Sequence, residues 1–309
     1  MPAKQEDSTG IGNTGTNSNR PVPDSRFWRF LRHPLTRIVI ATVAIATVIG
    51  GLQFAALAAH IDPYSTPGVG IAVLIIVATL ATYIAYVRFI ERRPVIELAT
   101  HKAGAELAVG ALIGAAMFGF TMLVLWFARC VEVTAGGGWR AAAFPLLGAL
   151  IAGVTEEVLV RGVLFRIVEE SLGTWIALAL SAVIFGALHA FNPNATLVSS
   201  IAIALEAGVL LAAVFVFARR LWMVIGLHAA WNFTEGGIFG AGVSGTQEVG
   251  VLASHFQGPE VLTGGAFGPE ASIVAVLVGV SVALIFLVGA RRAGRIVQPW
   301  WRRASSTRR

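Results

Sequence analysis

The sequence predicts an all-α integral membrane protein with about eight transmembrane helices. Of its 309 residues, 56% are hydrophobic and only 13% are charged, and the mean hydropathy is +0.76. A soluble domain carries roughly 25% charged residues, so this composition excludes an ordinary soluble protein. The apolar residues also form uncharged blocks as long as the roughly 20 residues that cross a bilayer. The blocks favour one membrane domain, residues 37–290, over two soluble domains.

Four apolar blocks contain no Asp, Glu, Lys or Arg, and each predicts a membrane-spanning helix. They are residues 38–59, 69–87, 107–127 and 271–290. Four further apolar stretches are interrupted by ionisable residues, and we expect them to be helices as well. They are residues 141–161, 172–191, 195–218 and 221–233.

The segments outside these blocks are polar or rich in glycine. Residues 1–36 have too little apolar surface to offset the entropy of ordering, so we expect a polar cytoplasmic tail that is disordered to about Ser25. Residues 236–270 form a Gly-rich outer connection without Lys or Arg, which suits either a lid or a mobile connector. Residues 291–309 form a basic cytoplasmic tail.

The basic residues predict the orientation of the chain in the membrane. If eight helices alternate in direction, all of the 23 Lys and Arg residues except Arg129 and Arg140 fall on one side. The positive-inside rule then places both termini in the cytoplasm. The dense Arg-rich tails and compact loops are typical of a multi-pass protein of a bacterial plasma membrane.

The net charge and the cysteine content exclude several other classes of protein. A net charge of +6 and a pI of about 10.4 would suit a nucleic-acid-binding protein. Here the basic residues flank the apolar blocks, so their expected partner is the anionic surface of the lipid bilayer and not nucleic acid. The single cysteine, Cys130, excludes an intramolecular disulfide framework and a Cys-based zinc knuckle.

Ionisable residues inside the predicted spans are the candidates for function, because each costs at least ~2.5 kcal/mol to insert. Glu156 and Glu157 are adjacent, and Arg161 follows Glu157 by four residues, the spacing that favours an ion pair on one helical face. Glu156 has no such partner. Because two adjacent carboxylates repel each other, we expect different roles: Glu156 as a proton acceptor and Glu157 as an orienting group.

Two further helices supply the remaining polar groups. His189 lies near the end of one helix, and His228 and Asn232 share a face of another at a spacing of four residues. With Glu156 and Arg161, these groups form the set needed to activate a water molecule and to stabilise an oxyanion.

The helical rise predicts that the polar groups lie at one depth. If the fourth helix continues to a turn near residues 171–174, Glu156 and His189 each lie about 22 Å from that turn. His228 lies about 12 Å inward from Arg220, so the depths agree if the turn protrudes by roughly 10 Å. We therefore expect a polar catalytic cavity in the cytoplasmic half of the bilayer.

Structural explanations compete with each of these assignments. An intramembrane Glu–Arg pair or a single histidine often joins helices without any chemistry, and Glu206 suits a structural or cavity-lining role. At the level of function, two alternatives to an enzyme remain. One is a non-catalytic membrane scaffold or immunity protein, and the other is a proton-coupled transporter with Glu156, Glu157 and His189 as its relay.

At these residues the chain resembles the CPBP family of intramembrane proteases, also known as the CAAX-protease and bacteriocin-processing, or Abi, family. The family pattern EExxxR, FxxxH and HxxxN stands here as 156–161, 185–189 and 228–232. The resemblance covers about residues 141–233. Each motif alone is short, but three in order on three separate predicted spans are specific.

The resemblance implies an eight-helix endopeptidase that cleaves a peptide or a membrane-protein substrate near the cytoplasmic membrane face. By analogy, Glu156 and His189 hold and activate the attacking water, and His228 and Asn232 stabilise the oxyanion. Glu157 and Arg161 set the geometry. The family is commonly described as metalloproteases, and zinc would take Glu156, His189 and His228 as ligands. The HExxH motif is absent, so hydrolysis by glutamate without a metal stays an alternative.

Overall fold

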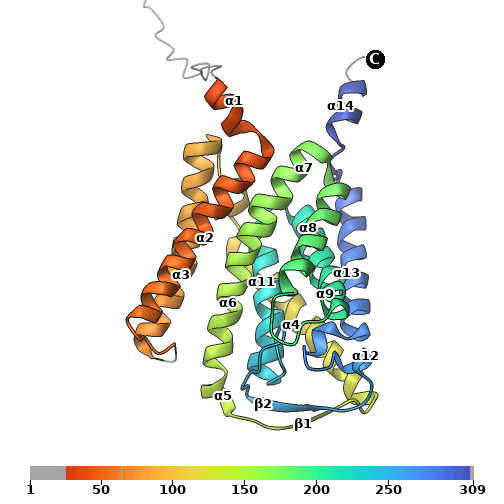
Figure 1. Ribbon diagram of the computed structural model, residues 1–309. Helices are drawn as coiled ribbons and strands as arrows, with labels where there is room; N and C mark the ends of the chain where they lie inside the picture. Colours follow the sequence, from red (N-terminus) through yellow and green to blue (C-terminus); the bar gives the residue numbers. More distant parts are fainter. Residues whose placement is uncertain (1–25, 64, 307–309) are drawn as a thin grey trace, which may run out of the picture.

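The computed structural model describes residues 26–63 and 65–306 and shows a bundle of helices (Figure 1). Both ends of the described chain, α1 and α14, lie at one end of the bundle, which we call the terminal end. Strands β1 and β2 lie at the opposite end, which we call the outer end. The disorder expected for residues 1–25 falls outside the described residues. The predicted all-α architecture is confirmed.

The helices follow one another along almost the whole described chain. The α-helices are α1 Arg26–Arg32, α2 Pro34–Ala58, α3 Thr66–Ala85, α4 Ala103–Phe127, α5 Gly138–Ala141, α6 Ala143–Glu157, α7 Arg166–Leu172, α8 Thr174–His189, α9 Leu197–Ile203, α10 Val209–Ala218, α11 Leu221–Asn232, α12 Glu260–Thr263, α13 Ile273–Arg292 and α14 Trp300–Ser306. Four π-helical segments continue these helices: η1 Tyr86–Glu91, η3 Val158–Phe165, η4 Ala204–Gly208 and η5 Phe233–Ile238. Two 3₁₀ turns are η2 Ile96–Leu98 and η6 Pro269–Ala271.

Six helical segments of the described chain are long and apolar enough to cross a membrane, in agreement with a multi-pass membrane protein. They are Pro34–Ala58, Thr66–Glu91, Ala103–Phe127, Gly138–Leu172, Leu197–Ala218 and Ile273–Arg292. Two more were expected. Of these, α8 is apolar but has only 16 residues, because the turn that contains Asn192 and Pro193 follows it. The other, α11, has 12 residues and continues into η5.

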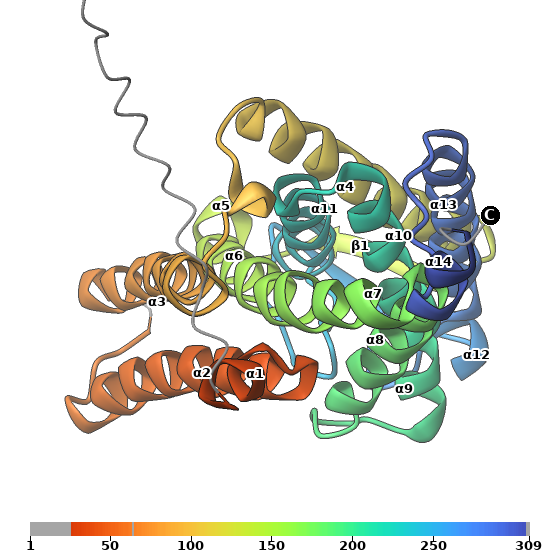
Figure 2. The same ribbon diagram turned by 90° about the horizontal axis from the view of Figure 1, so that it is seen from above.

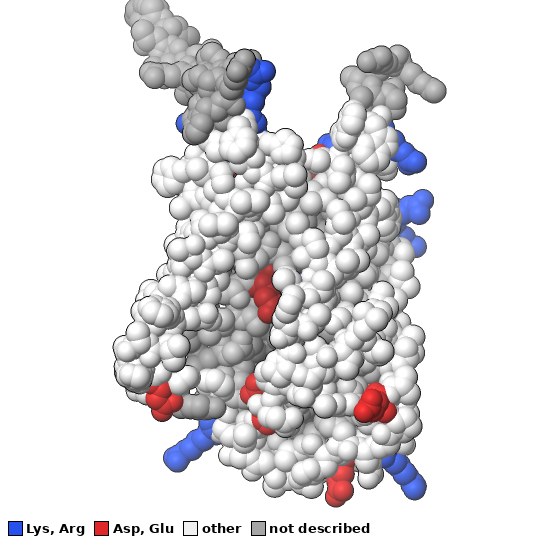
Figure 3. Space-filling model, viewed as in Figure 1, with Lys and Arg blue, Asp and Glu red and all other residues white. Residues whose placement is uncertain are grey.

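The charged residues mark the two ends of the bundle. Figure 3 shows Lys and Arg along the edges of the bundle and none in the middle of this face, where one patch of Asp or Glu lies. At the terminal end, Glu91 accepts hydrogen bonds from Arg37 at 2.6 Å and from Arg166 at 2.8 Å. Glu170 also pairs with Arg37, at 2.6 Å. These pairs tie α2 and η1 to the polar end of the fourth helix, which continues to a turn at Gly173 as expected.

Helix α11 lies in the middle of the bundle, where it packs against α4, α6 and α10 (Figure 2). Glycines allow this close approach. Gly110 and Gly114 of α4 face the backbone of α11 at Met223 and Leu227, and Gly153 of α6 faces it at Ala229. The helix that carries His228 and Asn232 is therefore positioned by backbone-to-backbone packing, as is common between membrane helices.

Substitution Gly114→Ala should displace α11, because the new Cβ would overlap the carbonyl oxygen of Leu227. We expect a lower unfolding midpoint in detergent and a lower yield of folded protein, since overpacking typically costs about 1–3 kcal/mol. Gly119→Ala is the matched control on the same helix, because its Cβ would meet nothing within 4 Å. Equal midpoints for the two variants would contradict this account of the packing.

The outer connection is folded, and it contains a strand that the sequence pattern did not predict. Strand β2, Leu252–Phe256, pairs antiparallel with β1, Val131–Ala135, which follows α4. Asn194 donates a side-chain hydrogen bond to the carbonyl of Gly245 at 2.9 Å, which ties the connection to the turn after α8. The connection therefore packs back onto the helices.

Candidate active site

Glu157, Arg161 and His228 form a buried cluster where α6, η3 and α11 meet. The Glu157 and Arg161 side chains are completely buried. Glu157 Oε1 accepts a hydrogen bond from Arg161 Nη1 at 2.9 Å, so the pair expected from the spacing is present. The same oxygen lies 2.8 Å from Nδ1 of His228, a contact between helices that the sequence did not predict. Glu157 thereby holds both a guanidinium and an imidazole in place.

Arg161 is held by groups that π-helical turns leave free. Its Nη2 donates to the carbonyl oxygens of Ala207 at 3.3 Å and Gly208 at 3.1 Å, both in η4. A π-helical turn breaks the regular i→i−4 hydrogen-bonding pattern, and such turns are frequent at functional sites. The Arg161 guanidinium also lies 4.6 Å from the centre of the Phe185 ring. These contacts offset the cost of burying the charge.

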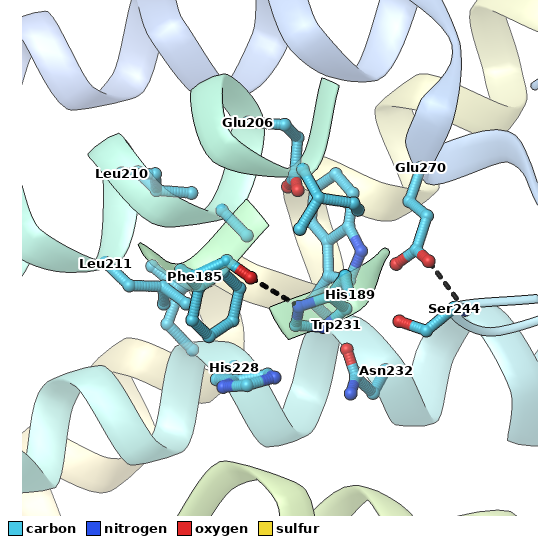
Figure 4. A pocket seen from close by; sticks show the side chains of 13 residues that line it. Phe185, His189, Glu206, Leu210, Leu211, His228, Trp231, Asn232, Ser244 and Glu270 are labelled. Carbon is cyan, nitrogen blue, oxygen red and sulfur yellow. Dashed lines mark hydrogen bonds between the residues drawn. The ribbon is translucent and has the colours of Figure 1, made fainter. Parts of the chain in front are cut away.

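His189 is oriented by its own helix. Its Nδ1 lies 2.8 Å from the carbonyl oxygen of Phe185, one turn earlier in α8 (Figure 4). Because a carbonyl oxygen only accepts hydrogen bonds, Nδ1 carries the hydrogen and Nε2 of the neutral ring keeps its lone pair. The Phe185 and His189 rings are 4.6 Å apart, centre to centre. Phe185 therefore supports both His189 and Arg161.

Four of the predicted residues line one cavity of about 260 Å³. They are Glu156, His189, His228 and Asn232, from three separate helices. Glu156 is half-buried, and its Oε2 is buried without a hydrogen-bond partner among the described residues. Glu157 and Arg161 lie behind this surface. The tertiary structure therefore brings all six predicted residues together, four in the wall of the cavity and two buried behind it.

The segment that carries these residues matches the model of one known family. The family is described as type II CAAX prenyl endopeptidase Rce1-like, and the match covers residues 138–234. Over this segment the chain is similar to that family. The resemblance noted from the three motifs is thereby confirmed. Searches of curated proteins and of solved structures found no match.

The structure corrects two expectations about the Rce1-like segment. Arg161 was counted among the positive charges on the cytoplasmic side, but it lies inside the bundle, in a helix that continues to Leu172. Arg161 therefore adds nothing to the positive charge at the membrane surface. The spacing could not show this, because the acceptors in η4 come from a distant part of the chain.

The second correction concerns the surroundings of the cavity. Helical rise alone placed the cavity in the half of the membrane nearer the termini. In the structure, Val243, Ser244, Thr246 and Glu248 of the outer connection line it together with Glu156. The cavity therefore extends toward the outer end of the bundle. Helical rise could not reveal this wall, because it applies only to residues within helices.

One acidic residue next to the three motifs, Glu270, was not predicted from the sequence. Glu270, which lies at the end of the outer connection, and Glu206 line a second, smaller cavity together with His189 and His228 (Figure 4). Glu206 thus has the cavity-lining position that was one of its two expected roles. For Glu270 the available signal was its place just before an uncharged span, which is weak by itself.

The donor set expected for zinc is not assembled as a ligand cluster. Within residues 26–63 and 65–306, no group of three His, Cys, Asp or Glu side chains is arranged to hold a metal ion. Glu156, His189 and His228 line the same cavity, and the Nδ1 contacts of His228 with Glu157 and of His189 with Phe185 leave Nε2 of each ring free, as in histidines that bind a metal. The three side chains are nevertheless not gathered into one cluster among the described residues. The geometry therefore does not match a preformed tetrahedral zinc site.

Proposed function

We propose that the protein is an intramembrane endopeptidase that hydrolyses a peptide bond with a water molecule activated by Glu156 and His189. One observation carries the proposal: Glu156, His189, His228 and Asn232, from three helices, face a single cavity. The match of residues 138–234 to a prenyl endopeptidase family supports the same reaction class.

In the proposed reaction, Glu156 removes a proton from a water molecule that also donates a hydrogen bond to His189 Nε2. The water oxygen attacks the peptide carbonyl carbon, and Glu156 then passes the proton to the leaving amine. Its buried, unpartnered Oε2 leaves acceptor capacity for this step. Glu156 is half-buried, and hydrogen bonds are stronger where a group is partly removed from bulk water.

His228 and Asn232 stabilise the negative oxygen that forms in the transition state. Asn232 donates from its side-chain amide. Because Nδ1 of His228 is committed to Glu157, His228 donates from Nε2 only when its ring is an imidazolium, the form that a neighbouring carboxylate favours. Glu157 and Arg161 act through His228 and are positioning residues. Zinc takes no part in these steps.

The substrate and the membrane orientation are part of the same proposal. We infer eight spans in a bacterial plasma membrane, with both termini in the cytoplasm, from the distribution of Lys and Arg. The peptide then enters from the outer end, where the connection lines the cavity. Entry from the outer end differs from cleavage near the cytoplasmic face, which helical rise alone predicted.

Cleavage by the purified protein in detergent tests the proposal. The substrates are a prenylated CAAX-type peptide and a pool of unmodified peptides. We expect His189→Ala to lower the rate by roughly 10²–10⁴-fold, the usual contribution of a group that handles the proton. Exposed His101 gives the control variant His101→Ala, which should cleave at the normal rate.

Two further measurements test whether the reaction needs a metal ion and from which side of the membrane the peptide enters. Activity that survives a chelator titration supports the metal-free reaction, and its loss with recovery on added zinc supports a zinc enzyme. Peptide supplied to the outer surface of intact cells should be cleaved faster than peptide supplied to inverted vesicles.

If the folded protein cleaves none of the peptides, the proposal is contradicted and the non-catalytic scaffold is favoured. Proton-coupled flux without any cut peptide favours the transporter.

A further inference from the structure

Three buried glutamates outside the three motifs lie together beside the candidate active site. Glu206 is in η4, Glu235 in η5 and Glu270 in η6, and their exposed fractions are 2%, 0% and 3%. Each carboxyl acts electrostatically on at least one of the others. The tertiary structure therefore places three carboxyl groups from distant parts of the chain in one buried region.

Among the described residues, none of these three glutamates forms an ion pair with Lys or Arg. Within residues 26–63 and 65–306, the ion pairs of Lys and Arg join other carboxylates. The titratable groups that face Glu270 from the packed helices are His189 of α8 and His228 of α11. No three side chains of the cluster and its neighbours are arranged to hold a metal ion. Three adjacent buried carboxyls without a cation cannot all be ionised, because repulsion and desolvation add together.

Unpartnered polar atoms at the cluster point independently to a missing ligand. Among the described residues, neither carboxyl oxygen of Glu235 has a hydrogen-bond partner, and the indole Nε1 of buried Trp231 has none either. Trp231, Glu206 and Glu270 line a cavity of about 20 Å³ (Figure 4). Such a cavity is large enough for one water molecule, and polar walls favour its occupancy.

We propose that Glu206, Glu235 and Glu270 form a buried proton-binding site that keeps at least two of the three carboxyls neutral, with one water in the adjoining cavity. A proton between Glu235 and Glu270 supplies the hydrogen bond that two carboxylates cannot make. The water can accept from the Trp231 indole and donate to a carboxyl. The site needs no protease activity, so it stands or falls separately from the proposed function.

The bound protons hold the outer connection against the candidate active site. Glu270 Oε1 accepts a hydrogen bond from the backbone N–H of Ser244 at 2.5 Å, and Ser244 also lines the larger cavity. Ser244 has a left-handed φ of 48°, which this contact helps to maintain. Loss of the protons would place like charges at this anchor. Proton binding is thereby coupled to the wall of the cavity.

The pH dependence of stability follows from the same arrangement. Burial raises the pKa of the Glu270 carboxyl, while His189 and the Ser244 N–H act in the opposite direction. The folded protein therefore binds more protons than the unfolded chain above the ordinary pKa of 4.5. Stability then falls as the pH rises toward the folded pKa, with the unfolding equilibrium constant increasing by up to about tenfold per pH unit for each proton.

Infrared spectroscopy of the purified protein tests the proton-binding site directly. At pH 7 we expect a carboxylic-acid C=O band that shifts in D₂O and disappears as the pH is raised. Glu206→Gln, Glu235→Gln and Glu270→Gln keep the shape of a neutral carboxyl. At least two of these variants should each reduce the intensity of the band by about the amount that one carboxyl contributes. Exposed Glu132 gives the control variant Glu132→Gln, which should leave the band unchanged.

The outcomes separate the proposal from its competitors. Absence of the band in the wild-type protein at pH 7 overturns the proton-binding site, as does a band that none of the three variants changes. Loss of stability on removal of metal ions, without an acid band, would show a bound cation in its place. If a variant does not fold, the pH titration of the wild-type band decides. None of these readouts uses peptide cleavage, so an inactive enzyme does not affect them.

Discussion

Replacing Glu156 by Gln is expected to reduce the rate of peptide cleavage by roughly 10²–10⁴-fold, the contribution typical of a general base. The amide has nearly the shape of the carboxylate but cannot accept the proton of the attacking water. The loss should appear in kcat with little change in KM, because the group acts on the water and not on peptide binding. A zinc-dependent reaction would show the loss together with weaker metal binding.

Glu156→Gln should stay folded, which makes its activity informative. Glu156 is half-buried and takes part in no ion pair among the described residues. The unfolding midpoint of Glu156→Gln should therefore match that of the wild-type protein. Glu132→Gln makes the same chemical change at an exposed position and should retain full activity. Normal cleavage by Glu156→Gln would contradict the assignment of Glu156 as the proton acceptor.

Replacing Arg161 by Met should destabilise the fold by about 3–5 kcal/mol, the usual cost of breaking a buried ion pair from one side. The substitution leaves the Glu157 carboxylate buried with only His228 as a partner. It also removes the donor to the carbonyls of Ala207 and Gly208. We expect a clearly lower midpoint of thermal unfolding in detergent, and a loss of activity because His228 loses its support.

A double variant separates the uncompensated charge from the loss of packing. Glu157→Leu combined with Arg161→Met removes both charges, and should unfold at a higher temperature than Arg161→Met alone. Exposed Arg88 gives the control variant Arg88→Met, which should unfold at the same temperature as the wild-type protein. An Arg161→Met protein as stable as the wild type would show that Glu157 is neutral in the fold.

The positions of most helices could be predicted because the membrane imposes a simple physical requirement. Backbone groups in lipid must be hydrogen-bonded within the segment, so long uncharged blocks become helices. The segments around residues 38–59, 69–87, 107–127 and 271–290 were found in this way. The extension of the fourth helix to a turn near residue 173 was also expected, but its tertiary contacts were not. The hydrogen bond from Arg166 to Glu91 joins it to a distant part of the chain.

The six candidate site residues were also recognisable in the sequence, because ionisable groups are costly in lipid and rarely occur without a function. The spacing of Glu157 and Arg161 even predicted their ion pair. The support that Glu157 gives to His228 could not be predicted from the sequence. The contact of His228 with Glu157 depends on the close approach of α6 and α11 at Gly153, which no periodicity in the sequence reveals.

The sequence by itself determined that this is a helical membrane protein with a polar site carried by three motifs, because hydropathy and the cost of buried charge are properties of short segments. Only the tertiary structure decided that the outer connection lines the cavity and that Glu206, Glu235 and Glu270 meet beside it. Those contacts join residues far apart in the chain. The free energy of these contacts depends on which surfaces the packed helices bring together, and the pattern of residues along the sequence does not reveal that arrangement.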